Sequence, residues 1–181
     1  DPTEGALEKG FVVPRGGELR SILGKGEQTP CEYRTAHEVT LWPLDLVEAQ
    51  YFAGREPVAQ LESADLARVR AGVRLRLRTT LPDLSIGNLA LDRLELFLHG
   101  GDVLPGRLYE QLLANAVMVV VRPGERPAPW YEKVAGSAIQ RLGFEDGQAL
   151  LPCPPPSFHG YRLLHEYFAF PQRYLFVALS G

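Results

Sequence analysis

The strict alternation of residues 73–78 constrains the fold more than any other feature of the sequence. Aliphatic and cationic side chains take turns along this segment: Val73, Leu75 and Leu77 alternate with Arg74, Arg76 and Arg78. A period of two places the aliphatic side chains on one face of an extended strand and the arginines on the other. The segment therefore predicts a half-buried β-strand, and we expect residues 94–98 to pair with it.

Glycine and proline interrupt the chain often. Together, 18 glycines and 15 prolines occur in 181 residues, about 18% against about 12% in average usage. Strand-like runs lie at 11–13, 18–23, 32–35, 39–42, 44–49, 117–121 and 174–179, and helix-like runs at 107–116 and 161–170. The turn at Pro14–Gly17 predicts that 18–23 is the return strand for 11–13. This pattern predicts an α+β protein, mainly antiparallel and sandwich-like, with a few short helices.

The length allows one large domain or two small ones. Residues 10–100 are rich in strands, and residues 101–181 contain two helix–strand units, so these stretches are possible subdomains. We expect one compact unit, because the apolar run of the final strand needs burial on both faces. Without an initiator Met or a secretory signal, the chain is expected to be a processed product or a fragment cut from a longer protein.

Composition and motifs exclude several classes of protein. The formal net charge of −3 disfavours a basic nucleic-acid binder, and no run approaches the roughly 20 apolar residues of a membrane helix. Phosphate-binding glycine loops, the zinc-protease helix motif and the serine-hydrolase elbow are all missing from the sequence. We therefore predict no catalytic residue, no cofactor and no direct membrane insertion.

One repeated spacing suggests a metal site. Cys31 and His37 are six residues apart, and so are Cys153 and His159. Two thiolates and two imidazoles suit tetrahedral zinc, although this spacing matches no standard finger. Packed thiols and hydrogen-bonded histidines are the favoured interpretation. A zinc-stabilised module and a β-sandwich ligand-binding domain are kept as alternatives.

Two segments are candidate contact surfaces for a protein partner. The first is the arginine stripe, Arg74, Arg76 and Arg78, which we expect to pair with acids such as Glu95 or to meet an acidic partner. Nucleic acid is disfavoured, because aromatic residues do not alternate with these arginines. The second is the segment 161–170, with Tyr161, Tyr167 and Phe170. Core packing is the favoured interpretation of its aromatic residues and of Phe168, Tyr174 and Phe176, and an interface is the alternative.

Four segments in order carry a family resemblance. They are Gly10–Gly16 (GFVVPRG), Cys31–Leu44 (CEYRTAHEVTLWPL), Leu104–Leu113 (LPGRLYEQLL) and Gly160–Tyr174 (GYRLLHEYFAFPQRY). Together they resemble the TssF family, also called ImpG or VasA, of bacterial type VI secretion systems. Members of that family are considerably longer than this chain, so the resemblance marks it as a central fragment. The first two segments are also similar to wedge proteins of contractile phage baseplates.

The resemblance implies a structural role without catalysis. It implies a baseplate wedge subunit that assembles with TssG, TssK, TssE, other TssF copies and the VgrG spike. It also implies a place at the cytoplasmic face of the inner membrane, where the baseplate nucleates the contractile tail that delivers effectors.

Overall fold

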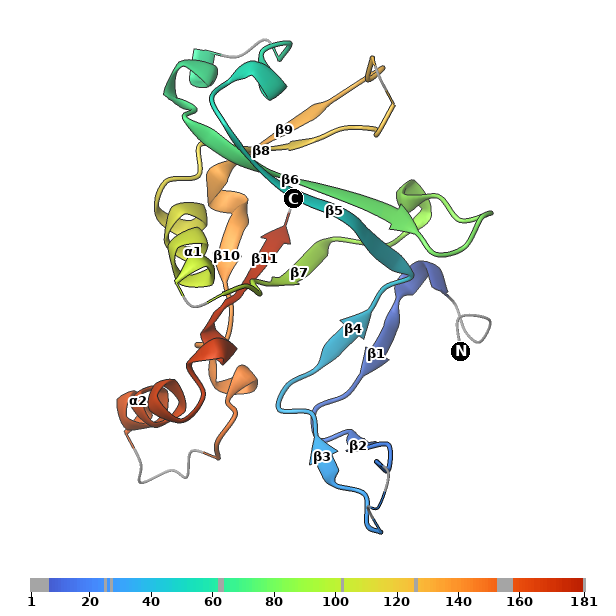
Figure 1. The fold of residues 1–181 in the computed structure, drawn as a ribbon, viewed down its shortest axis with the longest axis vertical. Coiled ribbons are helices and arrows are strands. Elements are labelled where there is room, and N and C mark those ends of the chain that lie inside the picture. Colours follow the sequence, from blue (N-terminus) through green and yellow to red (C-terminus); the bar gives the residue numbers. More distant parts are fainter. Residues whose placement is uncertain are drawn as a thin grey trace.

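A computed structural model describes residues 7–24, 26, 28–61, 64–101, 103–125, 127–152 and 158–180 (Figure 1). The strands of this described part pair antiparallel throughout, in several two-stranded ribbons and one three-stranded sheet. Helices α1 (Leu104–Ala114) and α2 (His159–Ala169) accompany them. The predicted α+β class with mainly antiparallel pairing is confirmed, and its sheets are small.

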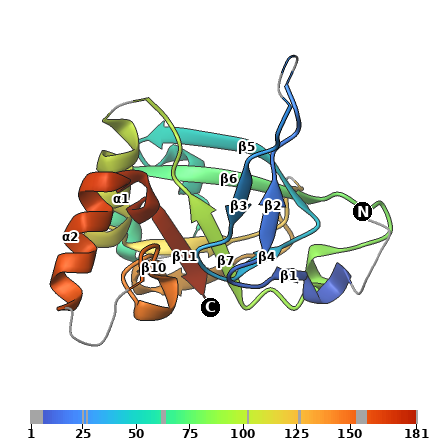
Figure 2. The ribbon, with the colours of Figure 1, turned by 90° about the horizontal axis from the view of Figure 1, so that it is seen from below.

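The first four strands form one long hairpin. Its strands are β1 (Phe11–Val13), β2 (Glu18–Arg20), β3 (Glu32–Arg34) and β4 (Val39–Leu41). Phe11 lies opposite Leu41 and Leu19 lies opposite Tyr33, so the β1–β4 pair and the β2–β3 pair have the same register. We call residues 10–24 and 28–42 the arm. It extends away from the other strands and helices in Figure 1, and in Figure 2, seen from below, it lies in front of them.

The predicted pairing of 11–13 with 18–23 is wrong. The turn at Pro14–Gly17 bends one strand of the arm but does not reverse the chain. Backbone bonds continue through the bend, because Gly16 N–H donates to Thr35 O at 2.8 Å and Thr35 N–H donates to Gly17 O at 3.0 Å. The sequence correctly places a turn at Pro14–Gly17, but this turn does not join paired strands. Strand β1 pairs with β4, and β2 pairs with β3.

Gly10 begins the arm in a conformation that favours glycine. Its φ is +70°, and a Cβ atom there would lie 2.6 Å from Cγ2 of Thr40. We expect Gly10→Ala to destabilise the arm by about 1–3 kcal/mol, because it adds left-handed strain and a clash. Faster amide hydrogen exchange in β1 and β4 of the full-length protein would show this. Gly101→Ala, where nothing lies within 4 Å of the added Cβ, is the control, and equal exchange in both variants would contradict the prediction.

The arginine strand pairs with a different strand from the one predicted. Strand β6 (Ala71–Thr79) pairs with β5 (Leu44–Ala53), not with residues 94–98. Asp45 faces Arg78 and Glu48 faces Arg76 across the ribbon. Opposite charges in directly facing positions favour this register. The acidic residues of β5 therefore provide the negative charges that Glu95 was expected to provide.

The three-stranded sheet joins distant parts of the described chain. Strand β11 (Phe176–Ser180) lies between β7 (Arg93–Phe97) and β10 (Ile139–Arg141). Its residues Val177 and Ala178 are almost completely buried, as the apolar run of the final strand predicts. Helix α1 lies against β10 (Figure 1). The remaining ribbon consists of β8 (Met118–Val121) and β9 (Glu132–Ala135).

The molecule has far more surface than a compact protein of its size. Its accessible surface is 13289 Å², whereas a compact monomer of this mass exposes about 8,700 Å². The buried apolar residues of the described chain are few: Leu61, Leu89, Leu142, Ala149, Tyr174, Val177 and Ala178. The excess of about 4,600 Å² exceeds what a standard interface buries on one partner. Such a surface is typical of a segment that packs against further protein.

Candidate protein interface

Helix α2 carries its apolar residues outward and its charged residues inward. Arg162 and Glu166 are 4% and 0% exposed, whereas Tyr161, Leu164 and Phe168 are 66%, 55% and 80% exposed. We call these three residues and the exposed Phe158 the α2 stripe. Their spacings of three and four residues place them along one face of the helix. An exposed apolar stripe on a folded helix is typical of a protein-binding surface.

The aromatic residues near α2 divide into two groups. The predicted core position is confirmed for Tyr174, which is buried, and Phe176 is half-buried and stacks on Phe97. Core packing is wrong for the others, which are exposed: Tyr161, Tyr167, Phe168 and Phe170. A contact role for Tyr161, Tyr167 and Phe170 stays a prediction, and their exposure leaves them available for it.

The Glu166 carboxylate holds α2 in this inverted orientation. Its Oε1 accepts N–H bonds from Leu150 at 2.9 Å and Leu151 at 3.0 Å. Arg162 Nη1 lies 3.2 Å from both carboxylate oxygens, and Oε2 also accepts bonds from Arg173 and, at 3.1 Å, the Tyr174 hydroxyl. A buried carboxylate is tolerated when donors of this kind surround it.

The same arginines also bind backbone carbonyls. Arg162 Nη2 donates to Phe144 O at 3.2 Å, and Arg173 Nη2 donates to Gly143 O at 3.1 Å and to Gln148 O. We call residues 143–151 the bearing segment, because α2 and its buried charges rest on it. The polar network therefore turns the helix so that its apolar stripe faces away from the body.

The buried donors shift the pKa of two groups. Burial raises the pKa of the Glu166 carboxyl, but the Leu151 N–H, Arg162, Arg173 and Tyr174 together outweigh burial, so its net pKa is lowered. Burial, and then the hydrogen bond to Glu166, raise the pKa of Tyr174. At neutral pH the pair is thus a carboxylate and a protonated phenol.

The lowered pKa of Glu166 predicts an acid-sensitive contact between α2 and the bearing segment. Because the folded pKa lies below the ordinary value of about 4.3, the stabilisation is complete above that value and is lost as pH falls through the folded pKa. We expect the Leu150 and Leu151 amides to exchange faster at pH 3 than at pH 6, after correction for intrinsic rates. Glu166→Gln removes the titrating group, so a pH dependence that persists in this variant would contradict the assignment.

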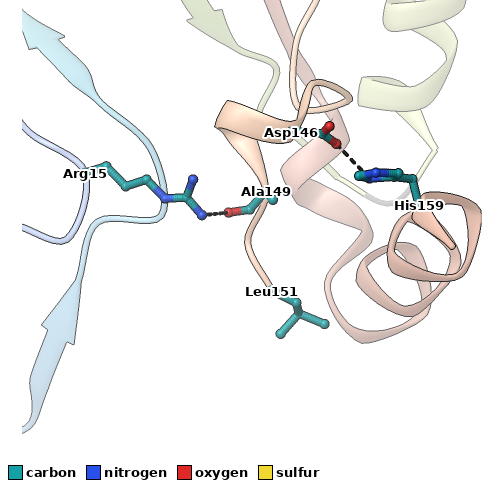
Figure 3. A pocket seen from close by; sticks show the side chains of 5 residues that line it. All are labelled: Arg15, Asp146, Ala149, Leu151 and His159. Carbon is teal, nitrogen blue, oxygen red and sulfur yellow. Dashed lines mark hydrogen bonds and ion pairs between the residues drawn. The ribbon is translucent and has the colours of Figure 1, made fainter. Parts of the chain in front are cut away.

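A hollow of about 330 Å³ lies where the arm meets the bearing segment (Figure 3). Its lining residues are Arg15, Asp146, Ala149, Leu151 and His159. Arg15 Nη2 donates to Ala149 O at 3.0 Å, and His159 Nδ1 lies 3.0 Å from Asp146 Oδ1. Asp146 also contacts Arg162 at 3.4 Å. Through these contacts the lining residues connect the arm, the bearing segment and α2.

The structure gives the zinc candidates separate surroundings. Cys31 is an exposed free thiol, the His37 ring meets Phe176 edge-on, and His159 contacts Asp146. Cys153 lies outside the described residues. Among the residues that the structure describes, no group of three or more metal-binding side chains gathers.

The arginine stripe is largely matched by β5. Arg74 lies 3.6 Å from Glu48, and Arg78 lies 3.7 Å from Asp45. Glu95 pairs with Arg93 at 3.2 Å instead. The stripe is therefore a paired, partly solvated face, as predicted. The acidic residues that pair with it are Glu48 and Asp45 of β5, and not Glu95. A contact role for Arg74, Arg76 and Arg78 stays a prediction.

Two further exposed apolar faces were not predicted from the sequence. On the arm, the facing pairs Phe11–Leu41 and Leu19–Tyr33 are exposed, while Arg34 and Glu18 form an ion pair at 2.6 Å. On β5 and β6, the exposed apolar residues are Leu46, Val47, Tyr51 and Val73. The alternation of apolar and polar residues in β2, β3 and β4 was the available signal, but its interpretation depended on knowing which strands pair.

Fold and surface together define an α+β segment of small antiparallel sheets with several exposed apolar faces. The family model of the type VI secretion system protein TssF matches residues 1–181, and the chain therefore belongs to the TssF family. It is 50% identical over 181 residues to the type VI secretion system component TssF1 of Pseudomonas aeruginosa. The alignment covers 100% of this chain and 29% of that relative, so the chain spans less than a third of the relative's length.

A solved structure shares the fold. The match is to a chain from a TssK-TssF-TssG baseplate subcomplex of the type VI secretion system, with a TM-score of 0.72 and 23% identity. It covers 97% of this chain and 31% of the other. Among the described residues, neither 11-residue helix nor any other helix has the length and apolar character to cross a membrane.

Proposed function

We propose that this chain is a structural segment of a type VI secretion baseplate subunit and that the α2 stripe binds another baseplate protein. The inverted helix carries the proposal, because a buried ionic cluster holds Tyr161, Leu164 and Phe168 in an outward position. Family membership and the fold shared with a TssK-TssF-TssG subcomplex support TssG and TssK as partners.

The wider assembly follows from the family resemblance. We propose TssE, the VgrG spike and other TssF copies as further neighbours, at the cytoplasmic face of the inner membrane. There the baseplate nucleates the contractile tail. The arginine stripe is a second proposed contact surface on β6, and its exposed members are Arg76 and Arg78. Its partner surface is acidic, because β5 neutralises the stripe only in part.

We also propose that the segment acts without catalysis. Two carboxylates near α2 take part in contacts within the fold. Glu166 accepts several hydrogen bonds, and Asp146 contacts both His159 and Arg162. Membership in a family of baseplate components supports this proposal, and the hydrogen bonds of the buried Glu166 carboxylate are used to hold α2.

Co-purification of the full-length protein with TssG and TssK from the same gene cluster tests the proposal. We expect stable capture at fixed stoichiometry, without stoichiometric zinc in the purified complex. Failure to capture either partner would contradict the structural role. One zinc ion per chain in the same sample would favour the alternative of a zinc-stabilised module.

A further inference from the structure

Arg15 joins the arm to the body of the molecule. It lies in the bend between β1 and β2, and its guanidinium reaches across to the bearing segment (Figure 3). Nη2 donates to Ala149 O at 3.0 Å, and Nη1 donates to Gly147 O at 3.4 Å. A planar fork that engages two carbonyls restrains direction as well as distance.

The buried charges beneath α2 hold the same stretch of backbone from the other side. The N–H groups of Leu150 and Leu151 donate to Glu166, and Gln148 O accepts from Arg173. Successive peptide groups of residues 147–151 are therefore bound by the arm and by the α2 cluster. A displacement of this backbone relative to α2 breaks bonds to a buried carboxylate, which is costly.

We propose that Arg15 is a positioning residue that fixes the angle between the arm and helix α2 through the bearing segment. Through this link, binding of a partner at the α2 stripe also restrains the arm without any contact between that partner and the arm. This last step rests on the proposed function, whereas the mechanical link between arm and helix does not. The bend at Pro14–Gly17 is the place where the arm would otherwise change direction.

Hydrogen exchange in the full-length protein distinguishes coupling between the arm and helix α2 from a local effect of the Arg15 side chain. In free Arg15→Ala, we expect at least about threefold faster exchange of the Gly16 and Thr35 amides in the arm. We expect the same direction of change at Leu150 and Leu151, which Arg15 does not bind. Arg15→Lys keeps the charge but not the fork, so it should resemble Arg15→Ala. Arg20→Ala, at an exposed arginine of β2, should change neither region.

The second measurement adds TssG and TssK. In the wild type, complex formation should slow exchange both in α2 and in the arm. In Arg15→Ala, the slowing in α2 should persist and that in the arm should disappear. Equal slowing of the arm in both proteins would overturn the proposal, because a partner would then hold the arm directly.

The free protein tests the link independently of any partner. Unchanged Leu150 and Leu151 exchange in free Arg15→Ala would overturn the proposal whatever the partners do. If α2 itself gains no protection in the wild-type complex, the proposed function fails. In that case the free-protein comparison still decides whether Arg15 couples the arm to the helix.

Discussion

Glu166→Gln is expected to weaken the contact between α2 and the bearing segment by about 3–5 kcal/mol, the usual cost of leaving a buried charge without its partner. The glutamine amide keeps the shape of the side chain but leaves Arg173 buried without a counter-charge and Arg162 with only the exposed Asp146 as an acidic partner. In the full-length protein this loss should appear as roughly 10²- to 4 × 10³-fold faster exchange of the Leu150 and Leu151 amides, since each 1.4 kcal/mol is a factor of ten.

Glu110→Gln provides the matched control for that variant. Glu110 is an exposed glutamate in the other helix, α1, and removal of a solvated surface charge usually changes stability by less than about 0.5 kcal/mol. If Glu166→Gln behaves like Glu110→Gln, the buried cluster does not hold the helix, and the explanation of its inverted orientation is wrong.

Aspartate substitutions in the α2 stripe are expected to weaken assembly strongly without unfolding the protein. Leu164→Asp or Phe168→Asp places a charge in the centre of the proposed interface, where loss of an anchor costs about 2 kcal/mol or more, about 30-fold in affinity. Both side chains are exposed, so thermal stability should stay close to that of the wild type. Titration of TssG and TssK against each variant measures the effect.

Gln111→Asp on α1 controls for the added carboxylate, because Gln111 is exposed on a helix that carries no part of the stripe. It should bind the partners with unchanged affinity. Unchanged affinity in the stripe variants as well would contradict the interface. A large loss of thermal stability in them would instead place the stripe inside the fold of the full-length protein.

Sequence patterns predicted individual elements better than their pairing. The alternation of residues 73–78 predicted the strand β6, and both predicted helices lie within a few residues of α1 and α2. The strand partners were wrong because register depends on distant matches, such as Asp45 opposite Arg78. A local pattern contains no information about which distant segment supplies that match.

The inverted helix could not be predicted from hydrophobicity, because that argument assumes that apolar side chains face inward. Arg162 and Glu166 are four residues apart, which resembles an ordinary solvated ion pair. What distinguishes them is Arg173, placed by the turn after Pro171 so that a second guanidinium reaches the same carboxylate. Only the folded chain brings these three charges together.

Photocrosslinking from the α2 stripe tests the central claim most directly. A photoreactive phenylalanine analogue replaces Phe168 in the full-length protein, and the baseplate complex is assembled and irradiated. The control position is Val121, an exposed residue of β8. We expect Phe168 to give a crosslink to TssG or TssK that the Leu164→Asp substitution removes. Crosslinks confined to the protein's own polypeptide would show that the rest of the same chain covers the stripe, and would contradict its role as an interface between baseplate proteins.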